Sequence, residues 1–297
     1  MSERFDIAII GTGPAGLEAA ITASVRGKKV LLLGEADLSS KLSKAHEINN
    51  FLGFPHISGA DLANRFSEHL KSLNLSITPD RIAAVYPMGD YYALQGKQEN
   101  YETTCIILAT GMIAEKPLPG ELENLGRGVS YCATCDAAFY RGKTAIIAAY
   151  TPSEEDEAIF LAEVADKVTY LPVYESGESL SRLKSNEKIE VMENEKPISL
   201  SRADNKTTVT CASGASVTAD GAFILRDSIA PGTLLGGLET DGPHIKCDRT
   251  MSTNLPGVFA CGDVTGLPYQ YIKAAGEGNV AALSAVQYLA SLASKSK

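Results

Sequence analysis

The sequence lacks several features that would assign it to whole classes of protein. It has no run of about eighteen apolar residues, the length a membrane-spanning helix needs, so we expect no membrane partner. Its 36 acidic and 27 basic residues give a formal net charge of −9, which argues against nucleic acid as the main partner. No basic leader with an apolar core precedes the first apolar segment, so we expect a cytoplasmic protein.

Metal-ligand patterns are missing as well. A structural zinc site usually needs four ligands, and no second C-x-x-C or H-x₃-H accompanies the pair Cys132 and Cys135. The four histidines are scattered: His46, His56, His69 and His244. The sequence therefore predicts no metal site.

The pair Cys132-x-x-Cys135 favours redox chemistry instead. In a chain without an export leader, closely spaced cysteines are more typical of a dithiol/disulfide couple than of a structural crosslink. The thiolate is the reactive species, and Asp136 directly after the pair could carry a proton to or from the leaving thiol. The other cysteines are expected to be packing residues: Cys105, Cys211, Cys247 and Cys261.

A strand–turn–helix unit opens the chain. The apolar segment "FDIAII" runs into "GTGPAG", Gly11 to Gly16, and then into a helix of small residues. In a G-x-G-x-x-G turn the first glycine permits the tight turn, the second lets the backbone approach a pyrophosphate, and the third lets helix and strand pack closely. Glu35 follows the next strand and could accept a hydrogen bond from a ribose hydroxyl. The alternative is a glycine-rich turn without a ligand.

A second strand–turn–helix unit begins at Thr144, but its turn has no glycine. The turn is Ala148 to Ser153, and each added Cβ would push a pyrophosphate away from the backbone. Thr151 and Glu154 have the spacing of a capping box that would satisfy the helix donors without a ligand. Four acidic residues, Glu154 to Glu157, are expected to repel a polyphosphate.

The two units indicate an α/β fold with two Rossmann-like, three-layer domains, the second inserted into the first. We place the first domain at residues 1–114 and 244–297, and the inserted domain at 115–243. Two turn-rich crossings mark the boundaries. Between Glu115 and Asp241 there are 21 acidic and 12 basic residues, so this segment carries the whole charge excess.

The motifs together resemble a known family. "IIGTGPAGLEAA", "EINNFLGFP", "ILATG", "CATCD", "GVFACGDV" and "AAGEGNVAALSAVQYL", in this order, are similar to the bacterial low-molecular-weight thioredoxin reductases, which are homodimeric flavoproteins. The resemblance covers nearly the whole chain. It implies FAD as cofactor, thioredoxin as electron acceptor, Cys132 as the cysteine that attacks thioredoxin, Cys135 as the one that faces the flavin, and Asp136 as the acid.

The resemblance also implies a set of FAD contacts. These are Gly11, Gly13, Pro14, Ala15, Gly16, Glu35, Asn50, Thr110, Gly111, Gly262, Asp263 and Gln270. At two further family positions the chain departs from the pattern: the usual Gly-Gly-Gln is Ser39-Ser40-Lys41, and the usual Arg-Gln-Ala is Tyr269-Gln270-Tyr271. Lys41 and Tyr271 are the expected FAD contacts there.

The inserted domain departs from the NADPH-dependent members of the family in two places. The glycine turn is lost, and the His-Arg-Arg stretch that grips the 2′-phosphate is replaced by Pro172-Val173-Tyr174, which has no basic residue. The chain therefore resembles in particular the NADPH-independent, ferredoxin-dependent flavin-thioredoxin reductases. This resemblance implies reduced ferredoxin as electron donor.

Other functions remain open on the sequence. The chain could be an NAD(P)H-dependent thioredoxin reductase with an atypical nucleotide site, or a flavin dithiol oxidase that passes electrons to oxygen. A third alternative is a non-catalytic FAD-binding redox sensor, against which the retained Cys-x-x-Cys-Asp motif argues.

Overall fold

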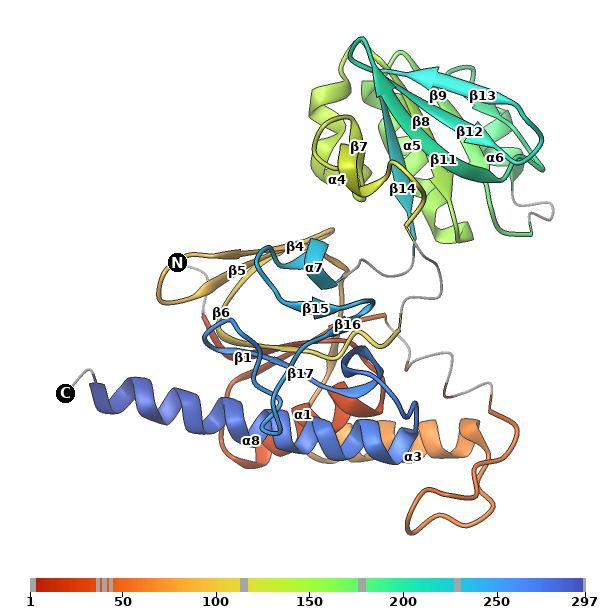
Figure 1. Cartoon of the computed structure of the whole chain (residues 1–297). Helices are drawn as coiled ribbons and strands as arrows, with labels where there is room; N and C mark the ends of the chain where they lie inside the picture. Colours follow the sequence, from red (N-terminus) through yellow and green to blue (C-terminus); the bar gives the residue numbers. More distant parts are fainter. Residues whose placement is uncertain are drawn as a thin grey trace. The chain divides into compact units, whose positions relative to one another are not determined.

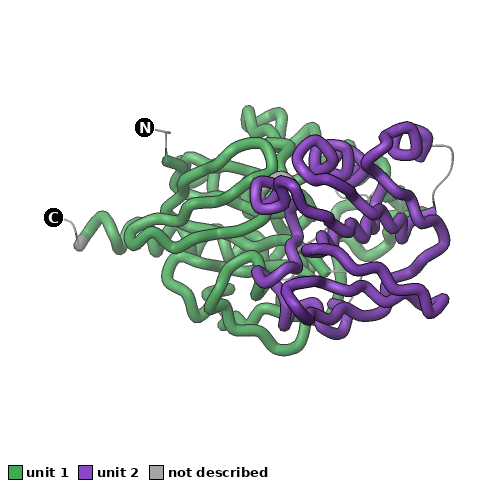
Figure 2. The backbone as a smooth tube through the Cα atoms, turned by 90° about the horizontal axis from the view of Figure 1, so that it is seen from above, with its two compact units in different colours: residues 1–113, 230–297 green, residues 114–229 purple. Residues whose placement is uncertain are grey.

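The computed structural model describes residues 4–35, 38, 42, 45–112, 117–175, 180–226 and 231–295, with the backbone alone at 134, 135, 231 and 295. The chain forms two compact units (Figure 2). Unit 1 comprises residues 1–113 and 230–297, and unit 2 comprises residues 114–229. Within the described part of the chain, no helix is long and apolar enough to cross a membrane.

Unit 1 is built on a mostly parallel sheet with the strand order β3-β2-β1-β6-β5-β4, and β17 pairs with β6. Its strands are β1 (Phe5–Ile10), β2 (Val30–Gly34), β3 (Ile77–Pro79), β4 (Ile82–Pro87), β5 (Tyr92–Gly96), β6 (Asn100–Leu108), β15 (Thr240–Asp241), β16 (His244–Ile245) and β17 (Val258–Ala260). Its helices are α1 (Pro14–Val25), α3 (Gly59–Ser72), α7 (Pro231–Leu234) and α8 (Tyr271–Lys295), with a 3₁₀ turn η5 (Gly262–Thr265). Strands β4 and β5 form an antiparallel extension of the sheet.

The core of unit 1 lies between the sheet and helices α1 and α8, which run along one face of the sheet (Figure 1). Alternate residues of β1, Ile7 and Ile9, point into this core because successive side chains of a strand face opposite sides. The two helices approach closely at Gly278, where a Cβ would clash with the carbonyl oxygen of Ala15. Gly278 of α8 therefore permits this helix-to-helix contact.

Unit 2 has a parallel sheet with the order β10-β9-β8-β14-β7 and a separate antiparallel sheet β11-β12-β13. Its strands are β7 (Val129–Ser130), β8 (Thr144–Ala149), β9 (Lys167–Pro172), β10 (Ile189–Val191), β11 (Pro197–Ala203), β12 (Lys206–Cys211), β13 (Ser216–Ala219) and β14 (Gly221–Leu225). Its helices are α4 (Ala133–Asp136), α5 (Glu155–Val164) and α6 (Ser181–Lys184), with 3₁₀ turns η1 (Leu122–Asn124), η2 (Ala137–Tyr140) and η3 (Pro152–Glu154).

The parallel sheet of unit 2 is buried on both faces. Ala145, Ile147 and Ala149 of β8 pack toward α5, whereas Ile146 and Ala148 pack toward the antiparallel sheet. Because both faces are covered, β8 is apolar throughout its length instead of alternating with polar residues. The predicted α/β class with two Rossmann-like domains, the second inserted into the first, is confirmed.

The second crossing lies earlier than the predicted boundary after residue 243, because the segment from 231 to 243 is bonded to unit 1. Leu235 forms a parallel bridge with Val85 of β4. Asn254 accepts a hydrogen bond from the Glu239 amide (2.9 Å) and donates one to the Gly237 carbonyl (2.8 Å). The sequence "ETDGPHIKCD" therefore contains the β15–β16 hairpin of unit 1 and is not a crossing.

Two glycines of α8 make a matched test of this packing. Gly278→Ala should destabilise the protein by about 1–3 kcal/mol, because the new methyl group overlaps the backbone of α1. Gly276→Ala, two residues away with nothing within 4 Å of its Cβ position, should be neutral or stabilise by about 0.5–1 kcal/mol. The midpoints of urea unfolding measure both, and equal midpoints for the two variants would refute the packing.

Candidate functional site

The glycine turn of unit 1 lies at the carboxyl end of β1, the strand between β2 and β6. Gly11 has φ +123°, and a Cβ there would clash with the carbonyl oxygen of Ala109, while a Cβ on Gly16 would clash with the carbonyl oxygen of Gly11. Pro14 is the first residue of α1 and Ala15 is buried against Gly262. The turn is thus tight for the reasons that the motif predicts.

The same turn leaves room for a ligand at Gly13, since a Cβ there would meet no atom within 4 Å. Gly13 lies at the N-terminus of α1, whose first N–H groups have no partner within the helix, and no side chain caps it. Thr110, next to Gly11 across the turn, has a buried hydroxyl oxygen without a hydrogen-bond partner. Open backbone donors and an orphaned polar atom fit a pyrophosphate-bearing cofactor such as FAD.

The other predicted FAD residues have different surroundings in the structure. Glu35 is exposed directly after β2, and Gly111 has φ +67° with open space around its Cβ position. Asn50 donates a hydrogen bond to Gln270 (2.7 Å), so the structure brings together two residues that are 220 positions apart. Tyr271 packs against an apolar cluster that contains Leu62. Lys41 lies outside the described residues.

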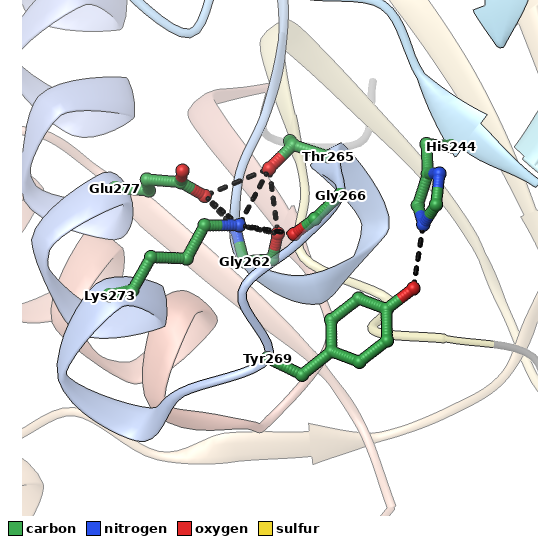
Figure 3. A network of polar contacts seen from close by, with 7 residues as sticks. All are labelled: His244, Gly262, Thr265, Gly266, Tyr269, Lys273 and Glu277. Atoms are coloured by element: carbon green, nitrogen blue, oxygen red, sulfur yellow. Dashed lines mark hydrogen bonds and ion pairs between the residues drawn. The ribbon is translucent and has the colours of Figure 1, made fainter.

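The Gly-Asp turn that carries Gly262 and Asp263 is held by two side chains of α8 (Figure 3). Lys273 donates hydrogen bonds to the carbonyl oxygens of Gly262 (3.0 Å) and Gly266 (2.8 Å) and to the Thr265 hydroxyl (3.2 Å). Glu277 accepts from the Gly262 amide (2.9 Å) and forms an ion pair with Lys273 (3.0 Å). This partly buried pair fixes the backbone of the turn.

Tyr269, which precedes Gln270, does not join that network. Its hydroxyl lies 2.8 Å from Nε2 of His244, and the two rings are in tilted contact (Figure 3). His244 was expected to be an isolated surface or core residue, and its pairing with Tyr269 was not predicted.

The redox motif of unit 2 runs into the short helix α4: Cys132 directly precedes the helix, and Cys135 lies in it. Cys132 is buried, 5% exposed, and is disulfide-bonded. The backbone amide of Cys132 donates a hydrogen bond to the Ser130 hydroxyl at 3.2 Å. The next amide, Ala133, donates to the buried carboxylate of Glu157 on α5 at 2.9 Å. Asp136 ends the helix and is half-buried. Burial is the main cause that raises the pKa of the Tyr140 phenol, and the charge of Asp136 raises this pKa further.

The remaining cysteines are free and match their predicted role as packing residues. Burial raises the pKa of the Cys105 thiol to about 12 and also raises the pKa of Cys261, Cys211 and Cys247. Thiols with raised pKa values form little thiolate near neutral pH and react slowly. Among the described residues, no group of three or more His, Cys, Asp or Glu could hold a metal ion.

The turn after β8 differs from its predicted form. Thr151 precedes a 3₁₀ turn, η3, and its hydroxyl lies 2.8 Å from the Ser153 hydroxyl, so it makes no capping bond to the helix. Thr151 is the N-cap of η3, which leads directly into α5 at Glu155. The predicted capping bond of the Thr151 side chain is therefore wrong, while the turn contains no glycine, as the sequence shows.

The four acidic residues of this segment differ in their exposure. Glu154, Glu155 and Glu157 are buried, with exposed fractions of 1%, 6% and 7%; Glu154 ends η3, and Glu155 and Glu157 lie in the first turn of α5. Asp156 is exposed and pairs with Arg182 at 3.1 Å. Repulsion of a polyphosphate by this helix turn stays a prediction.

Comparison with known proteins assigns the chain to a family. The model of the pyridine nucleotide-disulphide oxidoreductases matches residues 5–278. The chain belongs to this family. It is also 30% identical to the thioredoxin reductase of Bacillus subtilis, over 98% of both chains. The chain is therefore an oxidoreductase of the thioredoxin reductase type, as the motifs predicted, and FAD is the cofactor of such flavoproteins.

Two solved structures from Clostridium acetobutylicum are similar to this one, and both are of a ferredoxin-flavin thioredoxin reductase. The first has 49% sequence identity and a TM-score of 0.86, over 98% of this chain and 99% of that chain. The second has 44% identity and a TM-score of 0.87, over 97% of this chain and 99% of that chain. Both likenesses extend over both units.

Several residues of the site escaped the sequence analysis. The pair Lys273 and Glu277 could have been predicted, because a lysine and a glutamate four positions apart often pair on a helix. Glu157 gave no such signal, since its partner is a backbone amide 24 positions away.

The role of Lys273 can be tested through cofactor retention. Lys273→Met should weaken FAD binding roughly tenfold or more, because hydrogen bonds from a charged group contribute about 1.5–3 kcal/mol and this one holds the turn in place. Lys246→Met, at an exposed lysine of the same unit, is the control. Flavin fluorescence during reconstitution of the apoprotein measures the dissociation constants, and equal values for both variants would exclude the role.

Proposed function

We propose that the enzyme passes electrons from reduced ferredoxin through FAD and the Cys132–Cys135 couple to thioredoxin. The observation that carries this proposal is the combination of an open glycine turn in unit 1 with a glycine-free turn in unit 2, where a pyridine nucleotide would otherwise bind. The likeness to two ferredoxin-flavin thioredoxin reductases supports the same donor. We further propose a homodimer located in the cytoplasm.

FAD would be held by the residues of unit 1. Gly11, Gly13, Pro14, Ala15 and Gly16 would contact its pyrophosphate through backbone N–H groups and the N-terminus of α1. The other proposed contacts are Glu35, Lys41, Asn50, Thr110, Gly111, Gly262, Asp263, Gln270 and Tyr271. When bound, FAD supplies the conversion of one-electron transfers into a two-electron reduction.

The dithiol would act by thiol–disulfide exchange. The thiolate of Cys132 attacks the thioredoxin disulfide and forms a mixed disulfide, and Cys135 then attacks the Cys132 sulfur and releases reduced thioredoxin. Asp136 supplies or removes the proton of the leaving thiol. The contacts of Ser130 and Glu157 with the amides of Cys132 and Ala133 hold the attacking residue in place.

Anaerobic reduction of the flavin tests the donor. Reduced ferredoxin should bleach the flavin absorbance rapidly, whereas NADPH and NADH should leave it unchanged. Added thioredoxin disulfide should then restore the absorbance. Rapid bleaching by NADPH would overturn the proposal.

A cysteine variant tests the second half of the path. Cys135→Ser should still accept electrons into its flavin but should reduce no thioredoxin, because the exchange couple is broken. Cys247→Ser, at a free cysteine of unit 1, is the matched control and should retain activity. Thioredoxin reduction by the Cys135 variant at the wild-type rate would contradict the assignment.

A further inference from the structure

The parallel sheet of unit 2 has a topological switch point between β8 and β14. From β8 the chain continues to β9 and β10 on one side, while β14 and β7 lie on the other side. In open α/β sheets ligands bind in the crevice at the carboxyl ends of the two strands that flank such a point. Tyr150 directly follows β8 and Arg226 directly follows β14, so both residues lie at this crevice.

Tyr150 and Arg226 are in contact with each other and with Glu121. The Arg226 guanidinium carbon lies 4.7 Å from the centre of the Tyr150 ring, a cation–π distance. The guanidinium also forms a two-pronged ion pair with Glu121, with Nη2 donating to Oε2 at 2.8 Å and Nη1 donating to Oε1. Glu121 is fully buried and Arg226 is 8% exposed. The positive charge of Arg226 at the crevice is therefore already paired with the carboxylate of Glu121.

The carboxylate of Glu121 has further donors. The Tyr131 hydroxyl donates to Oε1 at 2.8 Å and the Leu118 amide donates to Oε2 at 2.8 Å. The pKa of Tyr131 is raised mainly by burial and further by the nearby charge of Glu121. The phenol therefore keeps its proton and remains a hydrogen-bond donor. Removing one partner of a buried ion pair leaves the other charge uncompensated, so a phosphate that took Arg226 from Glu121 would strand this carboxylate.

A second internal cluster lies after β9, where the family's 2′-phosphate-binding stretch is replaced. The Tyr174 hydroxyl donates to Oε1 of Glu155 at 2.7 Å and lies 3.1 Å from the Tyr170 hydroxyl. Glu155 is the first residue of α5 and is 6% exposed. The polar groups at this end of the crevice are also bonded to one another.

We propose that these two clusters fill the dinucleotide crevice of unit 2 with the protein's own side chains and so close it to pyridine nucleotides. Tyr150, Arg226 and Glu121 occupy the pyrophosphate end, and Tyr174 and Glu155 occupy the ribose end. This inference deepens the proposed function by naming the residues that exclude NAD(P)H. It assigns exclusion to occupied space and to charges that are already paired inside the protein.

Opening the crevice tests the inference, with ADP as the probe and flavin-saturated holoenzyme as the protein. Tyr150→Gly removes the ring, and Glu121→Gln releases the Arg226 charge for a phosphate. Wild type should show no saturable binding of ADP or NADPH up to about 1 mM in ligand-observed NMR. The double variant should bind ADP at least tenfold more tightly than wild type. Glu123→Gln, at an exposed residue of the same segment, is the control and should behave as wild type.

Two results would overturn the inference. One is binding of ADP or NADPH by wild type that perturbs Tyr150 and Arg226. The other is a folded, yellow double variant that binds ADP no better than wild type. If Glu121→Gln prevents folding, Tyr150→Gly alone decides between these outcomes, because it leaves the ion pair intact. The binding assay contains no ferredoxin, so its result does not depend on the outcome of the donor assay. Binding of a nucleotide to wild type without reduction of the flavin would refute the closed crevice but would leave the proposal of ferredoxin as donor intact.

Discussion

Polar groups at the carboxyl edge of a parallel sheet need partners, and the two units of this chain meet that requirement differently. In unit 1 the turn after β1 leaves backbone N–H groups open at Gly13, and the Thr110 hydroxyl has no internal partner. In unit 2 the corresponding edge is satisfied from within by Glu121 and Arg226. The same fold thus yields one unit suited to a dinucleotide cofactor and one that needs no ligand there.

The elements around each edge follow from this difference. In unit 1, α8 supplies Lys273 and Glu277 to hold the Gly262 turn, which keeps a second backbone segment fixed beside the first. In unit 2, α5 turns Glu155 and Glu157 inward, and Glu157 binds the amide next to Cys132. The helix that would face a phosphate in a nucleotide-binding relative instead supports the redox motif.

Local features of the fold and the site could be predicted from the sequence. The G-x-G-x-x-G turn depends on contacts within a few residues of Gly11 and on one neighbouring strand. The alternation of strands and helices is indicated by the pattern of apolar segments along the sequence. The missing glycines after β8 were equally visible. The capping bond of Thr151 was predicted wrongly because the hydroxyl of Thr151 has a competing partner, Ser153, which spacing alone does not reveal.

Long-range pairs could not be predicted in this way. Glu121 and Arg226 are 105 positions apart, and neither has a sequence neighbour that marks it as buried. The burial of Glu154, Glu155 and Glu157 could not be predicted from the sequence either, because it depends on how η3 and α5 pack on the sheet. The domain boundary near residue 230 depends on the bridge between Val85 and Leu235, which pairs distant segments.

The most direct test of the account is the electron balance of thioredoxin reduction without any pyridine nucleotide. Reduced ferredoxin and thioredoxin disulfide are mixed anaerobically with a catalytic amount of the enzyme, and oxidised ferredoxin and new thioredoxin thiols are counted together. The account predicts two ferredoxin clusters oxidised for each disulfide reduced, because each iron–sulfur cluster gives one electron and a disulfide takes two. Thiols that appear only after NADPH or NADH is added would contradict it.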